Sequence, residues 1–157
     1  MIILGIDPGL AKTGCGVIKL EKGKVKPLTY GVISTKPKEP LSQRLKIIYE
    51  DIREICREYQ PDVASIESIF FAANVKTAVA VAQARGVAIL ATEEGGLDLV
   101  EYSPLQIKQA IVGYGRATKK QVQEMVRVLL SLDQLPKPDH AADALAVALC
   151  HAFRLRR

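Results

Sequence analysis

Four side chains that commonly bind metal ions lie where predicted secondary-structure elements begin or end. Asp7 follows the apolar run IILGI, and Glu67 ends the run VASIE. His140 and Asp143 lie three residues apart in DHAADALAVALCH, so they would share one face of a helix. Carboxylates with one imidazole suit Mg²⁺ or Mn²⁺. Two such ions about 3.5–4 Å apart can hold the attacking and leaving oxygens of a phosphodiester. The pattern therefore favours metal-dependent phosphodiester hydrolysis, provided that the fold brings the four residues together.

Each of these residues also has a plainer interpretation. Asp7 in the triplet Asp-Pro-Gly fits a turn, and Glu67 fits a solvated strand end. His140 alone fits an ordinary surface or core histidine, and we interpret Asp139 as the N-cap of the last helix. Asp143 is harder to dismiss, because it precedes ALAVAL and lies on or beside a buried stripe where an unpaired carboxylate is costly. The combination is more informative than any one member.

The predicted elements place these residues in an α/β fold. The hydrophobic patterns predict strands within residues 2–9, 13–20, 27–35, 62–68 and 97–102, and helices at 41–59, 74–95, 103–111, 118–130 and from 139. Short turns make the first three strands an antiparallel meander, and helices join the later strands. We therefore expect a single domain over residues 1–157, with a mixed five-stranded sheet flanked by helices on both faces.

The order of the elements also predicts which carboxylates meet. In a sheet built by crossovers, the strand after the first helix commonly lies beside the first strand. Asp7 and Glu67 would then sit side by side at one end of the sheet. If the face of the last helix that carries His140 and Asp143 meets the same end, four metal-binding side chains converge.

Composition narrows the class of protein. The chain has 157 residues, a net charge of +5 and three widely spaced cysteines without a CxxC pair. Reduced thiols are the simplest interpretation, so we expect a cytoplasmic protein. The N-terminus lacks the features of a signal peptide, and no apolar run approaches membrane-spanning length, so we expect no membrane partner. The positive charge fits a polyanionic partner.

Several blocks of this sequence, in order, resemble the RuvC family of Holliday-junction resolvases. GIDPGLAKTGCGVI resembles the first strand and hairpin of that family, and IESIFFAANVKTA resembles its second acidic motif. QARGVAI, QIKQAIVGYGRATKKQVQEMV and DHAADALAVALCH resemble the later blocks in order and spacing. The resemblance covers essentially the whole chain, and the ordered set is far more specific than the Asp-Pro-Gly triplet alone.

The resemblance implies a ribonuclease-H-like fold, a homodimer and metal-dependent nicking of four-way DNA junctions. It places the catalytic carboxylates of the family on Asp7, Glu67 and Asp143, with two Mg²⁺ or Mn²⁺ ions per site. The fourth ligand position falls on His140, where many members have Asp. His140 would favour Mn²⁺ relative to Asp, or would position or deprotonate the attacking water; the sequence leaves both roles open. The implied partner is the RuvA–RuvB branch-migration complex.

The resemblance also implies DNA contacts. Phe70 matches the position that wedges into the junction and stacks on a base. Ala73 replaces a basic residue of many relatives, and Lys76 is a candidate substitute. A further basic segment supplies candidate phosphate contacts, although lysines usually line a solvated helix face; its members are Lys108, Arg116, Lys119 and Lys120.

The helix predicted at 74–95 is a candidate dimer element. Ala78, Ala82 and Gly86 are small enough to let a second helix approach closely. Packing on the protein's own sheet is the alternative, and it must occupy one face of the helix in any case.

Three other functions remain open from the sequence. DPGLAKTG resembles the phosphate loop of the actin/Hsp70-like ATPases, but the chain is short for their two lobes. A ribonuclease-H-like nuclease that processes ribosomal RNA would use a similar first motif. A non-catalytic junction-binding module is the third alternative, and the filled set of metal ligands argues against it.

Overall fold

The computed structural model describes residues 1–69 and 75–155. The strands are β1 (Ile2–Asp7), β2 (Lys12–Glu21), β3 (Lys24–Ser34), β4 (Val63–Glu67) and β5 (Asp98–Tyr102). The helices are α1 (Leu41–Tyr59), α2 (Val75–Glu94), α3 (Pro104–Val112), α4 (Lys119–Leu129) and α5 (Asp139–Arg154). Each predicted element is present in the predicted order, with ends that differ by a few residues.

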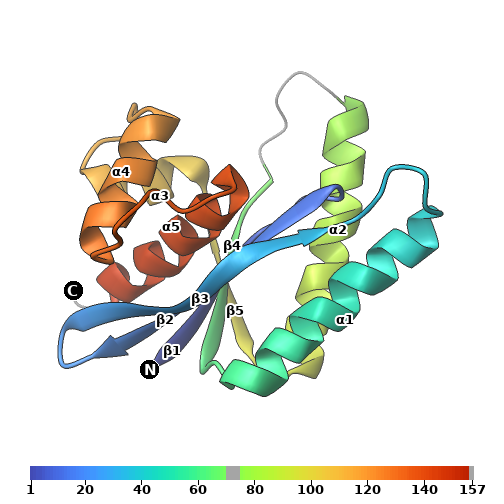
Figure 1. The fold of residues 1–157 in the computed structure, drawn as a ribbon, viewed down its shortest axis with the longest axis horizontal. Helices are drawn as coiled ribbons and strands as arrows, with labels where there is room; N and C mark the ends of the chain where they lie inside the picture. The colour runs from blue at the N-terminus through green and yellow to red at the C-terminus, as the bar shows by residue number, and fades with distance from the viewer. Residues whose placement is uncertain (70–74, 156–157) are drawn as a thin grey trace.

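The five strands form one mixed sheet in the order β3-β2-β1-β4-β5 (Figure 1). β1, β2 and β3 are antiparallel neighbours, whereas β4 and β5 run parallel to β1. This confirms the predicted meander followed by helical crossovers, and it puts β1 and β4 side by side within the sheet.

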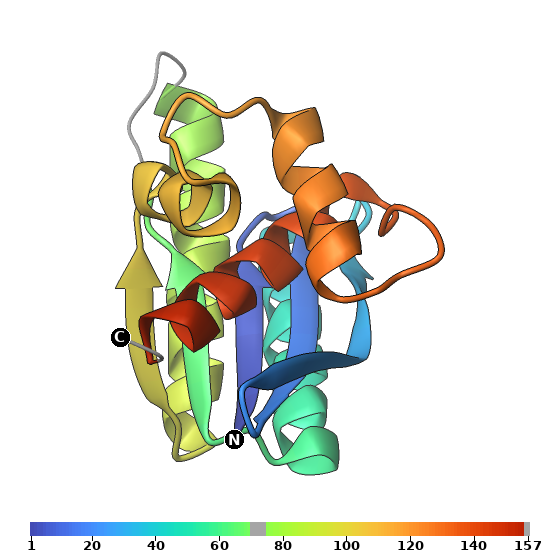
Figure 2. The ribbon, with the colours of Figure 1, turned by 90° about the vertical axis from the view of Figure 1, so that its left-hand side faces the viewer.

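Helices cover both faces of the sheet, as predicted (Figure 2). α1 and α2 pack on one face over a core that includes Leu4, Ile6 and Ile66. α3, α4 and α5 pack on the other face, around Leu145 and Leu149 of α5. Because α5 runs across β1 and β2, its first turn lies near the end of the sheet at which β1 finishes.

Glycines in β1 and β2 let α5 lie unusually close to the sheet. A Cβ atom on Gly14 would lie 1.9 Å from the carbonyl oxygen of His140, and one on Gly5 would lie 2.1 Å from that of Ala144. No side chain fits in either gap, so glycine is required by space and not by backbone conformation. The glycines of the second strand thus allow a close backbone approach, and the partner is α5.

The prediction that Asp139 caps α5 is wrong. The N-cap residue is Pro138, and no side chain caps the helix through a hydrogen bond. Asp139 is instead the first helical residue, where a carboxylate interacts favourably with the positive end of the helix dipole. Thr118 forms a capping box with Gln121 at the start of α4, and Ser103 caps α3 in the same way.

Candidate active site

The parallel pairing of β1 with β4 brings the first two carboxylates to one end of the sheet. The register pairs Ile6 with Ile66, so Asp7 and Glu67 each follow a paired residue at the same level. Asp7 also pairs with Gly14 of β2, over which the carbonyl oxygen of His140 lies. The sheet and the first turn of α5 therefore meet at Asp7.

Three of the four predicted ligands form a tight group. His140 Nδ1 and Asp7 Oδ2 are 2.8 Å apart. One ligand atom each from Asp7, His140 and Asp143 lies within 4.8 Å of the other two. Asp7 is the most enclosed, with 13% of its side chain exposed. Oxygen and imidazole donors at this spacing fit a divalent cation such as Mg²⁺ or Mn²⁺.

Glu67 lies beside this group, and the charge of the group changes the pKa of Glu67. Burial first, and then the negative charges of Asp7 and Asp143, together raise the pKa of Glu67 to about 7, against the opposing effect of Lys119 and Lys108. Burial likewise raises the pKa of Asp7, although the hydrogen bond from His140 opposes the change. These carboxylates are therefore short of positive charge, which a bound cation would supply.

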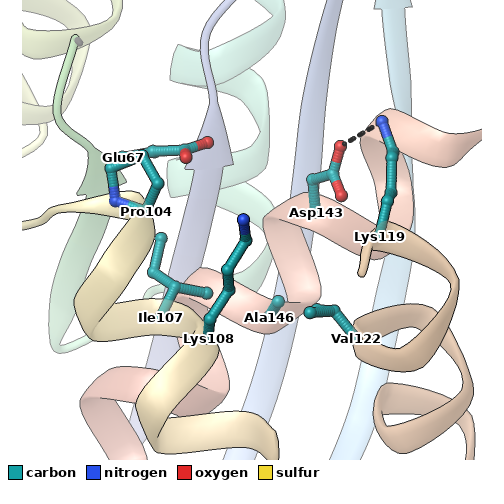
Figure 3. Close-up of a pocket in the computed structure, with 8 residues that line it drawn as sticks. All are labelled: Glu67, Pro104, Ile107, Lys108, Lys119, Val122, Asp143 and Ala146. Atoms are coloured by element: carbon teal, nitrogen blue, oxygen red, sulfur yellow. Dashed lines mark ion pairs between the residues drawn. The ribbon is translucent and has the colours of Figure 1, made fainter. Parts of the chain in front are cut away.

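A pocket of about 250 Å³ opens next to the carboxylates (Figure 3). Glu67 and Asp143 lie on opposite sides of it, and the ammonium group of Lys108 points upward between them. The remaining lining residues are Pro104, Ile107, Lys119, Val122 and Ala146. The pocket thus combines an acidic rim, two lysines and an apolar floor.

Lys119 is paired with the predicted ligands. Its Nζ lies 3.1 Å from Asp143 Oδ2 and 3.9 Å from Asp139 Oδ2. Sequence reasoning assigned Lys119 to DNA phosphates and missed this ion pair. The basic residue next to a helix start was visible, but its position over α5 depends on how the segment between α3 and α4 folds back.

Apart from Lys108, the other predicted DNA contacts do not line this pocket or lie outside the described residues. Arg116 precedes α4 and Lys120 is in its first turn, and both are exposed. Lys76 is exposed at the start of α2. Phe70 and Ala73 lie outside the described residues.

Comparison with known proteins gives a uniform result. Residues 3–151 match the family model for crossover junction endodeoxyribonuclease RuvC. A protein of that name from Alkaliphilus metalliredigens is 57% identical over 97% of this chain and 93% of its own length.

Solved structures agree with the sequence matches. A Thermus thermophilus RuvC structure matches with a TM-score of 0.92 and 40% identity, covering 99% of this chain and 96% of that one. A structure of T. thermophilus RuvC in complex with Holliday junction substrate matches with a TM-score of 0.94 and 38% identity, covering 99% and 95%. The fold, the grouped ligands and these matches together show that this chain belongs to the RuvC family of crossover junction endodeoxyribonucleases.

Proposed function

We propose that residues 1–157 form one nuclease domain that resolves four-way DNA junctions by nicking two strands symmetrically. The observation that carries this proposal is the convergence of Asp7, His140 and Asp143 at one end of the sheet, next to a pocket with two lysines. The relatives named as crossover junction endodeoxyribonucleases, and the relative solved with a Holliday junction substrate, support it.

Asp7, Glu67, His140 and Asp143 would hold two divalent ions, Mg²⁺ or Mn²⁺. Such ions, when bound, supply the positive charge that activates a water nucleophile and stabilises the leaving oxygen. The hydrogen bond between Asp7 and His140, and the interaction of Asp7 with the charge of Asp143, support a central role for Asp7 in this group. Hydrolysis would leave a 5′-phosphate and a nick that a ligase can close.

His140 has two roles open to it. As a ligand, its neutral imidazole would replace the carboxylate of many relatives and shift the preference toward Mn²⁺. As a positioning group, it would hold the attacking water by a hydrogen bond. Its Nδ1 faces Asp7 at 2.8 Å, which supports the ligand role because a cation at Asp7 would be within reach of the imidazole.

The lysines would bind and orient the DNA backbone. Lys108 and Lys119 line the pocket beside the carboxylates, where a scissile phosphate would have to enter. Arg116, Lys120 and Lys76 would contact phosphates farther out, and they contribute sequence-independent affinity. Phe70 remains our sequence-based proposal for the residue that stacks on a base at the junction.

A homodimer would place two such sites on one junction. Half of the residues of α2 are exposed, and an apolar stripe runs along this exposed side through Val75, Val79, Ala82, Gly86 and Leu90. Val75 is 80% exposed, and a Cβ atom on Gly86 would meet nothing within 4 Å. An exposed apolar stripe of this kind is typical of an interaction surface, and a second copy of α2 packed along it would bury it.

The expectation that no apolar run approaches membrane-spanning length is wrong for α2, which is long and apolar enough to cross a membrane by length and composition alone. About 22% of its most apolar window is buried in the structure, and such a helix by itself is weak support for a membrane span. Our proposal assigns its exposed face to the dimer. We further propose the cytoplasm as the location, since the cysteines are free and buried, and RuvA–RuvB as the protein partner.

The decisive experiment presents four labelled substrates with and without Mn²⁺. These are a four-way DNA junction, a linear duplex, a structured RNA and ATP. We expect paired symmetric nicks in the junction only, and only with metal. Cleavage of the RNA but not the junction, ATP hydrolysis, or tight junction binding without any cleavage would each overturn the proposal in favour of a different function.

A further inference from the structure

Lys119 is held in place over the metal-ligand group by the start of α4. Thr118 accepts a hydrogen bond from the backbone N–H of Gln121 at 3.2 Å, and its own N–H donates to Gln121 Oε1 at 2.8 Å. Tyr114 donates to the same Oε1 atom at 2.9 Å. This closed set of bonds fixes the first helical residue, Lys119, so its ammonium reaches Asp143 from a defined direction.

The charge of Lys119 bears on every carboxylate of the site. It contacts Asp143 and Asp139 directly, and its positive charge lowers the pKa of both Asp7 and Glu67. Burial lowers the pKa of Lys119, but its hydrogen bond and charge interaction with Asp143 outweigh this effect and raise the pKa overall. The side chain is therefore a firmly protonated cation within a group of acids.

We propose that Lys119 is the counter-ion of the metal-free site and releases Asp143 when a divalent cation binds. This inference rests on the proposed function, because it takes Asp143 as a metal ligand. Nζ lies 3.1 Å from Asp143 Oδ2, so a dication held by Asp143 would share a carboxylate with an ammonium group and repel it. Metal binding thus has to displace a cation that is already present.

The ammonium group of Lys119, once displaced, could move into the neighbouring pocket. Lys119 and Lys108 both line the pocket of about 250 Å³ beside Asp143 (Figure 3). A lysine that leaves the carboxylate is free to meet a DNA phosphate entering this pocket. Metal entry and the exposure of a phosphate-binding charge would then be two parts of one exchange. A lysine that only ties α4 to α5 would show no such competition.

The test measures Mn²⁺ affinity and thermal stability of the full chain without DNA. We compare wild type with Lys119→Gln, with the charge-conserving Lys119→Arg, and with Lys120→Gln, which removes one charge from the neighbouring exposed position. Isothermal titration gives the Kd for Mn²⁺, and thermal unfolding is recorded in chelator and in saturating Mn²⁺.

We expect Lys119→Gln to bind Mn²⁺ about two- to fivefold more tightly than wild type, the range that a partly exposed ion pair supports. In chelator it should melt about 1–3 °C lower, and saturating Mn²⁺ should abolish that difference. Folding and Mn²⁺ binding form one thermodynamic cycle. The free energy of unfolding that Lys119→Gln loses in chelator should therefore equal the free energy of Mn²⁺ binding that it gains. Lys119→Arg should resemble wild type, and Lys120→Gln should change neither quantity.

Each other outcome overturns the exchange. Equal or weaker Mn²⁺ binding by Lys119→Gln would show that the lysine does not compete with metal. A melting deficit that persists in saturating Mn²⁺ would show that Lys119 is only a structural tie between helices. A different result would refute the metal site of the proposed function itself. In that case the wild-type protein would show no Mn²⁺ binding, and its heat of titration would be the same as that of Asp7→Asn.

Discussion

Helices α5 and α2 have similar alanine-rich, apolar sequences, but they bury very different shares of their residues. Of the 16 residues of α5, eleven are buried, from Ala141 through Ala152. Of the 20 residues of α2, four are buried: Ala84, Ala88, Ala91 and Thr92. Composition alone therefore does not say whether an apolar helix belongs to the core of the domain or to a surface that needs a partner.

The difference follows from what each helix lies against. α5 crosses the central strands β1 and β2, and glycines there remove the side chains that would hold it away. α2 contacts α1 and the edge strand β5, so one of its sides has no neighbour among residues 1–69 and 75–155. The first arrangement builds a site whose ligands are positioned by the backbone. The second leaves an apolar stripe available for a second copy.

The first prediction concerns the carboxylates beside α5, where we expect the largest effect on the nicking rate. We expect Asp143→Asn or Asp7→Asn to lower the nicking rate about a thousandfold or more, because each removes a charged side chain from the proposed metal site. Junction affinity should change little, since phosphates and lysines dominate it. Gel-shift and cleavage assays on the same preparations measure both quantities. Asp139→Asn is the matched control on the same helical turn, and nicking by Asp143→Asn at the rate of this control would remove Asp143 from the mechanism.

The second prediction breaks the close packing that sets α5 apart from α2. Gly14→Ala would place a Cβ atom 1.9 Å from the carbonyl oxygen of His140, so α5 must shift or the strand must bend. We expect the free energy of unfolding to fall by about 3 kcal/mol. Gly31→Ala on β3 is the control, because a Cβ atom there meets nothing within 4 Å. Urea titrations that show equal stability for both variants would contradict the packing argument.

These contacts show where sequence reasoning succeeded and where it stopped. The strand-end carboxylates Asp7 and Glu67 were predictable, because parallel register at a crossover brings matching ends together. The ion pair of Lys119 with Asp143 was not, because it depends on the path of the chain between α3 and α4. The capping role given to Asp139 was wrong because the helix starts one residue earlier than a side-chain cap would require, with Pro138 at the N-cap.

The third prediction concerns His140, the one imidazole among the four proposed metal ligands. We expect His140→Ala to lower the nicking rate about thirtyfold, while His140→Asp stays active and shifts its preference from Mn²⁺ toward Mg²⁺. The reason is that Asp at this position supplies a hard oxygen donor within the same group. Rates of the three proteins in each metal decide the role. An inactive His140→Asp protein in both metals would assign His140 to water positioning, and full activity of His140→Ala would make it a bystander.

The fourth prediction turns to α2. We expect Gly86→Glu to weaken a homodimer about tenfold, because it puts an unpaired carboxylate into the apolar stripe. The stability of each folded chain should hold, since a side chain at Gly86 meets open space within the chain. Sedimentation equilibrium measures the dimer Kd, and Gln43→Glu on exposed α1 adds the same charge elsewhere. A dimer unaffected by Gly86→Glu would move the interface to another surface and leave the exposed stripe unexplained.

The fifth prediction tests whether the acidic site is short of positive charge. The pKa of Glu67 in the folded protein is raised from 4.5 to about 7, chiefly by burial and then by the neighbouring carboxylates. The folded state therefore favours the protonated acid, so its contribution to stability is fully present below pH 4.5 and is lost as the pH rises through about 7. In chelator, wild type should lose roughly 1 kcal/mol per pH unit relative to Glu67→Gln between pH 5 and 7.

Chemical denaturation at pH 5, 6, 7 and 8 measures that difference, with Glu58→Gln on the exposed side of α1 as the control substitution. Saturating Mg²⁺ at pH 8 should return the wild-type protein toward the stability of the Gln variant, because a bound cation replaces the proton as the partner of the ionised carboxylate. A constant difference across the range would mean that Glu67 is already ionised at pH 5, and the charge deficit of the metal-free site would then be smaller than its burial implies.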